Sequence, residues 1–426
     1  MEFNLIDFLL SFLDLTILDY ARAVWGDQPW LEPLLSVAYI VVIATIVLLL
    51  VFVVGWTERK VLARMQDRIG PNRVGGRYGM LQMVADVVKM MTKEVIIPAG
   101  ADKWAYLAAP VVSLTTSVLL FAVLPLAPGV VGVNLPSGIF YVMAISSVSI
   151  VGLLLAGWGS NNKYALLGAF RAVAQLVSYE VPLMVTLLVP VVLAGTLSLV
   201  TIVEEQTIPY FFYVPLAGII FFISILAETG RSPFDLLEAE SEIIAGFHIE
   251  YSGMYFGLFM AAEYIAIMFM SALFASVYWS GYNLFGLENL ILANGFALGR
   301  PLGLAVLIFK TAIIFFIFMW VRATLPRFRI DQLLDFNWKL MVPLSLVLLF
   351  VVVLLNKAID VYAPGITEFG RMSIHLLSNI LIGFVTLEIM RRQARRKREA
   401  AEGPGDGWRL EPVLAESGEA HLAHAD

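Results

Sequence analysis

Carboxylates are dense in one stretch of the chain, AETGRSPFDLLEAESEIIAGFHIEYSG (residues 227–253). It contains six carboxylates and one arginine, and it lies between two of the most apolar segments of the sequence. On a helix Asp235, Glu238 and Glu242 share one face, whereas Glu240 points to the opposite side. Two like charges about 4 Å apart repel by roughly 4 kcal/mol at an effective dielectric constant of about 20. The cluster therefore either faces water and basic partners or holds protons near neutral pH.

Two interpretations of this acidic stretch are open. In the first, its carboxylates handle protons, which we favour for Glu228 and Glu240. In the second, the stretch is a solvated acidic face that docks another subunit, and Glu238 fits either interpretation. Gly230 and Pro233 interrupt the helix before most of the acidic residues, so we expect a polar connection between two apolar spans.

Three more ionisable residues lie in or beside apolar segments. Glu180 precedes Pro182 at the mouth of a predicted span, where it either handles protons or merely caps and snorkels. Glu263 and Lys310 lie inside predicted spans. Because a charge within the membrane costs several kcal/mol, each is by default a functional site, and a structural ion pair with another helix is the alternative.

Basic residues gather in the stretch GWTERKVLARMQDRIGPNRVGGRYGMLQMVADVVKMMTKEVIIPAGADKW (residues 55–104). From Leu81 to Ile97 apolar residues recur at three- and four-residue intervals, which predicts a helix lying on the membrane surface. The first basic residues of the stretch are Arg59, Lys60, Arg64, Arg68, Arg73 and Arg77. They either serve a polar partner docked on this face or only anchor the chain to lipid headgroups.

The elements that position these residues are apolar helices. The chain has 426 residues, of which 60% are hydrophobic and 15% charged, and its mean hydropathy is +0.84. Repeated apolar runs of this length predict an all-α, polytopic transmembrane helical bundle, because hydrocarbon admits only helices or closed barrels. Nine spans are predicted, at about 34–54, 104–125, 140–158, 181–203, 210–227, 254–279, 302–324, 340–356 and 373–390.

The distribution of lysine and arginine predicts the orientation of the bundle. Placing the polar stretches 55–103, 159–180, 228–253 and 322–339 and the tail on the inner side puts 23 of the 28 basic residues there. The positive-inside rule then places the amino terminus outside and the carboxyl terminus in the cytoplasm. We therefore expect the functional region at the inner membrane surface.

Cysteine is absent from the sequence, and the four histidines are scattered. This chain therefore offers no thiolate for an iron–sulfur cluster or a Cys-type zinc site, and we expect no metal site in it. Redox chemistry here would use electrons supplied from elsewhere.

The predicted organisation has four parts. They are an amphipathic amino-terminal extension (1–33), a membrane core with the inner loops (34–356), an additional carboxyl-terminal span (357–392) and a disordered cytoplasmic tail (393–426).

Several motifs in this order resemble one known family. The blocks ERKVLARMQDRIGPNRVG, NNKYALLGAFRAVAQLVSYE, AETGRSPFDLLEAESEIIAGFHIEYSGM, MAAEY and RATLPRFRIDQLL are similar to those of the quinone-site membrane subunits of respiratory complex I, the H subunits of bacterial NADH-quinone oxidoreductases. The resemblance runs from about residue 34 to 355. Leu237 and Asn337 depart from it, standing where the family often has proline and glycine.

The resemblance implies a function that the composition alone does not. In such proteins the inner loops and peripheral partner subunits form a quinone chamber, with quinone as substrate and NADH, FMN and iron–sulfur clusters handled by the partners. It implies a proton route toward antiporter-like subunits through Glu180, Glu228, Glu240, Glu242, Glu263 and Lys310. It implies a quinone chamber that includes Arg59, Arg64, Arg73, Arg231 and Asp235. The expected location is the inner (plasma) membrane of the cell.

Two alternatives stay open at this point. The first is the equivalent membrane subunit of an ion-pumping hydrogenase or a related dehydrogenase, which need not reduce quinone. The second is a free-standing secondary transporter, which predicts inverted repeats with broken helices at the membrane midplane. No convincing internal repeat is visible in the sequence.

Overall fold

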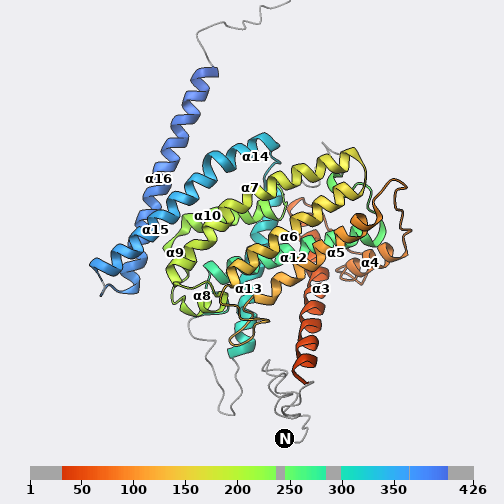
Figure 1. Cartoon of the computed structure of the whole chain (residues 1–426), viewed down its shortest axis with the longest axis horizontal. Helices are drawn as coiled ribbons and strands as arrows, with labels where there is room; N and C mark the ends of the chain where they lie inside the picture. The colour runs from red at the N-terminus through yellow and green to blue at the C-terminus, as the bar shows by residue number, and fades with distance from the viewer. Residues whose placement is uncertain (1–30, 237–244, 285–298, 364, 402–426) are drawn as a thin grey trace, which may run out of the picture. The chain divides into compact units, whose positions relative to one another are not determined.

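The computed structural model describes residues 31–236, 245–284, 299–363 and 365–401, and these are helical throughout with short connections (Figure 1). The helices are α3 (Leu31–Met65), α4 (Gln82–Thr92), α5 (Lys103–Leu120), η1 (Phe121–Val123), α6 (Gly138–Gly159), α7 (Lys163–Ala194), α8 (Leu199–Glu205), α9 (Tyr210–Tyr213), α10 (Pro215–Glu228), η2 (Gly246–His248), α12 (Gly253–Tyr278), α13 (Gly299–Thr324), α14 (Ile330–Phe336), η4 (Asn337–Met341), α15 (Val342–Tyr362) and α16 (Glu368–Ala401). The prediction of an all-α membrane bundle is confirmed for this part of the chain.

Eight of the described helices are long and apolar enough to cross a membrane, whereas nine spans were predicted. The difference is the predicted span 210–227, which is divided into α9 and the 14-residue α10. At 1.5 Å per residue α10 is about 21 Å long, shorter than the hydrocarbon layer of about 30 Å. The fifth apolar segment is thus a short helix inside the bundle, and most of its residues are buried.

Several stretches predicted as loops are extensions of the membrane helices. Helix α3 continues to Met65, and α7 already begins at Lys163, so α7 is 32 residues long. Helix α7 ends at Gly195, whose φ of 70° allows the left-handed turn that closes it, eight residues before the predicted end of that span. The surface helix predicted at 81–97 is the shorter α4. Charged residues near these boundaries therefore have fixed positions on helix faces.

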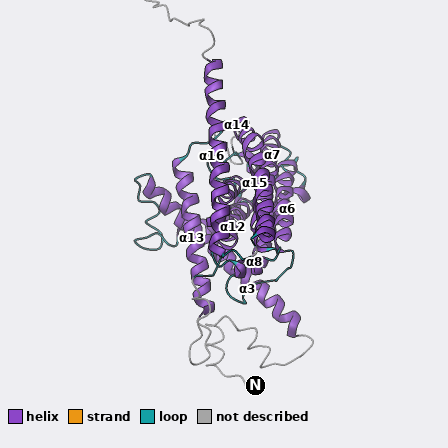
Figure 2. Ribbon diagram, turned by 90° about the vertical axis from the view of Figure 1, so that its left-hand side faces the viewer, coloured by secondary structure: helices purple, strands orange, loops and turns teal. Residues whose placement is uncertain are grey.

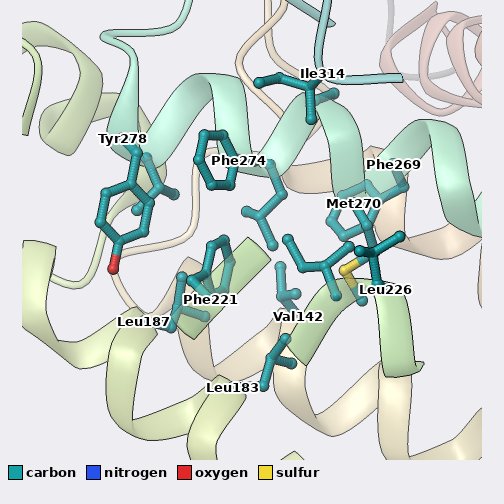
Figure 3. Packing of buried hydrophobic residues seen from close by; sticks show 14 of the residues in the cluster. Val142, Leu183, Leu187, Phe221, Leu226, Phe269, Met270, Phe274, Tyr278 and Ile314 are labelled. Carbon is teal, nitrogen blue, oxygen red and sulfur yellow. The ribbon is translucent and has the colours of Figure 1, made fainter. Parts of the chain in front are cut away.

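The core of the bundle is a cluster of large apolar side chains from α7, α10, α12 and α13 (Figure 3). Phe221 packs against both Phe274 and Tyr278, with ring centroids 6.0 and 5.3 Å away. Helices α5 and α6 approach closely at Gly152, where a Cβ atom would lie 2.5 Å from the Ser113 hydroxyl. Small residues at such crossings let helix backbones approach in a membrane, where apolar burial alone drives little association. Figure 2 shows that the described residues form helices and connecting loops, with no strand among them.

The chain divides into two units, the second of which begins at Ile380. The described part of this second unit is the continuation of α16 to Ala401. The sequence predicted disorder from residue 393 onward, but residues 393–401 are helical. The reason is composition, because ARRKREAA consists of good helix formers. The predicted amino-terminal amphipathic segment lies outside the described residues except for its last three positions, which begin α3.

Candidate functional site

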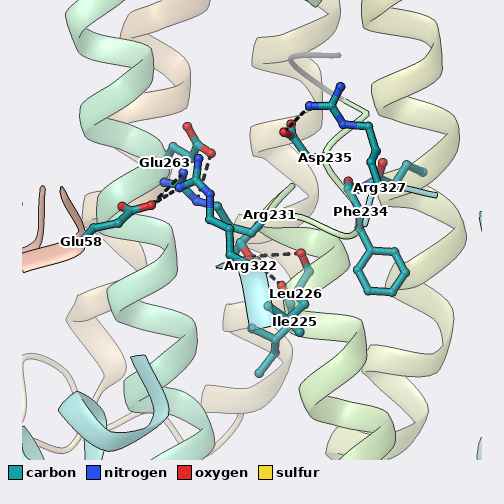
Figure 4. A network of polar contacts seen from close by, with 11 residues as sticks. Glu58, Ile225, Leu226, Arg231, Phe234, Asp235, Glu263, Arg322 and Arg327 are labelled. Carbon is teal, nitrogen blue, oxygen red and sulfur yellow. Dashed lines mark hydrogen bonds and ion pairs between the residues drawn. The ribbon is translucent and has the colours of Figure 1, made fainter. Parts of the chain in front are cut away.

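A buried network of ion pairs joins three helices and one connection (Figure 4). Arg231, in the segment that follows α10, lies 3.5 Å from a carboxylate oxygen of Glu58 on α3 and 3.4 Å from one of Glu263 on α12. Arg322 on α13 also donates to Glu58. The side chains of Glu58 and Arg231 are only 4% and 9% exposed, so these charges depend on one another for compensation.

The local backbone explains how Arg231 reaches this position. Helix α10 ends at Glu228, and Gly230 follows with a φ of 61°, a conformation that favours glycine. The Arg231 amide then donates to the carbonyl of Leu226, which turns the chain back toward the bundle. The guanidinium lies 5.2 Å from the centre of the Tyr264 ring, a cation–π distance.

A second ion pair fixes the beginning of the acidic stretch. Arg327 donates to Asp235 at 2.8 Å, and the rings of Phe234 and Phe328 are in contact beside it. The buried amide of Gln175 on α7 donates to the carbonyls of Ala227 and Phe234, at 2.8 and 2.7 Å. The connection after α10 is therefore held to α7 and to the segment before α14.

A cavity of about 110 Å³ adjoins the ion network. Its polar lining consists of Ser113 and Ser117 from α5, Ser149 from α6, Glu228 and Thr229, and Glu263 from α12. One oxygen of Glu228 has no hydrogen-bond partner among the described residues. The rest of its lining is apolar and includes Leu176, Phe247 and Phe259. A cavity of this size has room for several water molecules beside its polar groups.

Glu180 extends this acidic group onto α7. The Ser147 hydroxyl of α6 donates to a carboxylate oxygen of Glu180. The carboxylates of Glu180 and Glu228 are near enough to repel one another electrostatically. The structure thus brings together Glu180, Glu228 and Glu263, which the sequence separates by up to 83 positions.

The basic residues of the first stretch are not gathered at this network. Arg59 pairs with Asp86 on α4 at 2.5 Å. Burial raises the pKa of Asp86, but Arg59, together with the Gln82 amide and the charge of Lys89, outweighs this effect and holds that pKa below its usual value. Arg64, at the end of α3, and Arg73, in the turn before α4, are exposed. The pair of Arg59 and Asp86 attaches the surface helix to the end of α3.

Lys310 lies apart from the acidic group. Its ammonium donates three hydrogen bonds, at 2.7, 2.9 and 2.7 Å, to the carbonyls of Trp279, Gly281 and Asn283. These carbonyls follow the carboxyl end of α12, whereas Glu263 is the eleventh of the 26 residues of the same helix. At 1.5 Å per residue, Glu263 and Trp279 are therefore about 24 Å apart along the helix axis.

A partly buried histidine, His248, lies on η2 near the end of the acidic stretch. Burial lowers the pKa of His248 to about 4, and the nearby charge of Asp235 opposes this shift. The ring packs against Phe247 and Phe256, which leaves it in a largely apolar environment. His248 is therefore neutral at pH 7.

Sequence reasoning missed several members of this site. Neither Glu58 nor Arg322 was among the predicted site residues, and the serines of α5 and α6 were not noticed. The sequence did contain a signal that Glu58 is unusual, because it is a carboxylate immediately before Arg59 in a strongly basic stretch. The acidic residues Glu238, Glu240 and Glu242 lie outside the described residues.

A second cavity, almost entirely apolar, lies between α10, α13 and α14. Its lining includes Phe222, Phe234 and Phe328.

Among the described residues no group of three or more histidine, aspartate or glutamate side chains is arranged to hold a metal ion. The chemistry available here is that of buried carboxylates, guanidinium groups and hydroxyls around a polar cavity.

Comparison with known proteins gives a consistent assignment. The profile of the family described as NADH dehydrogenase matches residues 37–353. The chain is 45% identical over 310 residues to the H subunit of the NADH-quinone oxidoreductase from Dehalococcoides mccartyi strain CBDB1, covering 72% of this chain and 83% of the relative. It is 42% identical over 347 residues to the corresponding protein from Vesicomyosocius okutanii (79% and 96%) and 43% identical over 335 residues to that from Rickettsia rickettsii strain Iowa (78% and 95%). The ion network and the polar cavity lie within the matched residues, and this chain belongs to the NADH dehydrogenase family.

Proposed function

We propose that this chain is the membrane subunit of a proton-translocating NADH:quinone oxidoreductase, and that it forms part of the quinone chamber and links quinone reduction to proton movement. Its similarity to H subunits over more than two thirds of its length supports this proposal. FMN and iron–sulfur clusters would be bound by partner subunits, and quinone is the substrate. The remaining partners would be the peripheral quinone-site subunits and the antiporter-like and small membrane subunits of the same complex.

One observation carries the proposed coupling. Glu263 contacts Arg231 of the ion network and also lines the polar cavity together with Glu228. A change in charge at the network is therefore felt directly at a group that faces the cavity. Because interacting carboxylates titrate as a group, a proton gained or lost at one of them alters the proton affinity of the next.

The chemistry of the substrate supplies the driving force. A quinone that receives two electrons also takes up two protons, and withdrawing them leaves negative charge near the chamber. Moving one proton against 100 mV requires about 2.3 kcal/mol. Two like charges about 4 Å apart interact by roughly 4 kcal/mol at an effective dielectric constant of about 20, so one strong pairwise coupling suffices.

We propose a proton route through Glu180, Glu228 and Glu263, continued by Glu240 and Glu242. The polar cavity and the contact between Ser147 and Glu180 support the first three. Lys310 on α13 is proposed as a further member of the route, and its ammonium is held by the carbonyls of Trp279, Gly281 and Asn283.

The quinone chamber is proposed to include Arg59, Arg64, Arg73, Arg231 and Asp235. The exposed arginines lie at the end of α3 and in the turn before α4, where they remain accessible to a headgroup or to a docked subunit. Arg231 and Asp235 would instead hold the chamber wall, because both already have partners in the bundle. The distribution of basic residues favours an orientation in which the chamber faces the inner side of the cell membrane and the amino terminus lies outside.

Substitution of single carboxylates tests the proposed route. Glu228→Gln removes a titratable proton site but keeps its shape, and we expect quinone-linked NADH oxidation in membranes to fall by about tenfold or more while assembly is kept. Glu240→Gln is expected to act in the same way. Asp335→Asn is the matched control, because Asp335 is 59% exposed and forms a surface ion pair with Lys339. Unchanged turnover in Glu228→Gln would remove this residue from the route.

Purification tests the assignment to a complex. When the tagged chain is isolated from membranes in mild detergent, we expect flavin- and iron–sulfur-containing NADH dehydrogenase subunits to co-purify with it. We also expect the preparation to have NADH:quinone activity. Co-purification of hydrogenase subunits in their place would contradict the proposed function.

A further inference from the structure

Helix α16 lies beyond the residues that match the family, which end at 353, and it carries the most concentrated positive charge of the chain. Its sequence from 391 to 398 is RRQARRKR, so six of eight residues are basic. The described side chains of this run, Arg391, Arg392 and Arg395, are all exposed. We propose that this basic run is a binding site for anionic phospholipid headgroups in the leaflet that contains the carboxyl end of α16.

The length of the helix places the basic run at a membrane surface. Helix α16 has 34 residues, which corresponds to about 51 Å, whereas the hydrocarbon layer is about 30 Å thick. Residues 372–390, about 28 Å at 1.5 Å per residue, contain a single charged residue, Glu388 near their end, so this part spans the hydrocarbon. From Arg391 to Arg398 the helix rises about 10 Å, beginning where the apolar part ends. The first basic residues are therefore level with the lipid phosphates.

Repulsion between neighbouring basic side chains of the run favours the binding of anions there. Basic residues four positions apart, such as Arg391 and Arg395, face one another and repel. Among the three side chains of the run that the structure describes, Arg392 pairs with Glu388 at 3.0 Å, and a pair that is 72% and 42% exposed compensates little charge. Guanidinium groups bind phosphate oxygens through paired hydrogen bonds, so a layer of anionic lipid phosphates supplies the missing charge.

The composition of the run favours lipid over an acidic protein as the partner. At 100° per residue its six basic positions are spread around more than half of the helix circumference. It contains no aromatic or large apolar residue, and these residues dominate the centres of protein interfaces. A basic run that directly continues a span is instead typical of contact with anionic lipid.

Photocrosslinking of the complete complex tests the proposal. A photoreactive amino acid replaces Ala394, within the run, and the complex is reconstituted into nanodiscs of phosphatidylcholine with one fifth phosphatidylglycerol. We expect phosphatidylglycerol among the crosslinked lipids to exceed its mole fraction by about threefold or more at low salt, and to fall toward that fraction in 0.5 M NaCl. The same probe at Leu377, which is 66% exposed in the apolar part, is the control and should follow the bulk composition.

Two variants decide whether the basic residues are responsible. Replacing Arg391, Arg392 and Arg395 by glutamine should reduce the enrichment, and replacing all six basic residues should abolish it. If the variant with six replacements fails to assemble, the variant with three replacements and the salt dependence still show whether the basic residues cause the enrichment. Crosslinks that follow the bulk lipid composition would overturn the proposal. So would crosslinks mainly to a protein subunit, which would identify an acidic protein as the partner.

Discussion

Arg231 stabilises the fold by compensating the charge of buried carboxylates, and this role is separate from any contact with substrate. It lies between Glu58 and Glu263, and the first of these carboxylates is 4% exposed. Removing one partner of a buried ion pair costs about 3–5 kcal/mol, because the other charge stays buried without compensation. Arg322 still donates to Glu58, so the loss here should be at the lower end of that range.

We therefore predict that Arg231→Ala lowers the amount of assembled complex and its thermal inactivation temperature by several degrees. Lys339→Ala is the control, since Lys339 is 71% exposed and its pair with Asp335 lies on the surface. Equal behaviour of the two variants would show that the network contributes little to stability.

His248 makes the stability of this region depend on pH. Its pKa is lowered to about 4 in the folded chain, against 6.5 for a free histidine, because burial disfavours the charged ring. The unfolded chain therefore binds the proton first as pH falls. This contribution to stability is complete above about pH 6.5 and is lost progressively between 6.5 and 4.

The expected result is that thermal stability falls between pH 7.5 and 5.5 and that His248→Gln, which cannot be protonated, shows a smaller fall. Melting curves of the isolated complex at the two pH values measure this difference. An identical fall in the variant would assign the pH dependence to other groups.

Among the elements, α7 determines the position of the acidic connection. Gly168 of this helix lies against Gly246 at the start of η2, and a Cβ atom on Gly168 would be 2.6 Å from the carbonyl carbon of Gly246. A backbone atom has little room to move away from such a contact. The close approach fixes η2, and with it His248, on the surface of α7.

Gly168→Ala should therefore displace η2 and reduce both assembly and quinone-linked activity, even though alanine favours helices intrinsically. Gly383→Ala on α16 is the matched control, because nothing lies within 4 Å of its added Cβ atom. Activity and assembly measured in membranes compare the two. Full activity in Gly168→Ala would mean that η2 tolerates a shift.

The elements also show how far local patterns reach. The surface helix α4 was predicted from its apolar periodicity, because an amphipathic face is a property of neighbouring residues. The extent of α7 was not predicted. Its polar first half was assigned to a loop and its apolar second half to a span, although the two halves form one helix. Helix capping at Asn162, whose side chain accepts from the Tyr164 amide, was the local signal for its start.

At the scale of the whole molecule, the proposed function needs only part of the chain. The ion network and the linings of both cavities lie between Glu58 and Phe336, and the family match ends at 353. We predict that a chain ending at Tyr362, without α16, keeps quinone-linked NADH oxidation within about twofold. It should lose some thermal stability, because Glu368 accepts a hydrogen bond from Thr207 and His375 packs near Tyr213.

Rates per assembled complex measure this prediction. A truncated chain that assembles normally but turns over at less than about a tenth of the full rate would show that α16 takes part in the reaction itself.

The sequence by itself determined the class of this protein, the approximate positions of its spans and the resemblance to complex I membrane subunits. Apolar run length, the placement of basic residues and contiguous motifs are local properties, so they are readable without a fold. It also singled out Glu180, Glu228 and Glu263 individually, because a carboxylate in an apolar environment is conspicuous wherever it occurs.

Only the tertiary structure decided which of these residues act together. Glu58 and Arg322 are 264 positions apart in the chain, and their contact exists because α3 and α13 pack at the same end of the bundle. The same packing separates Lys310 from the carboxylates and places three carbonyls around it. Burial and pairing of charges depend on helix packing over long sequence separations, and no local pattern contains that information.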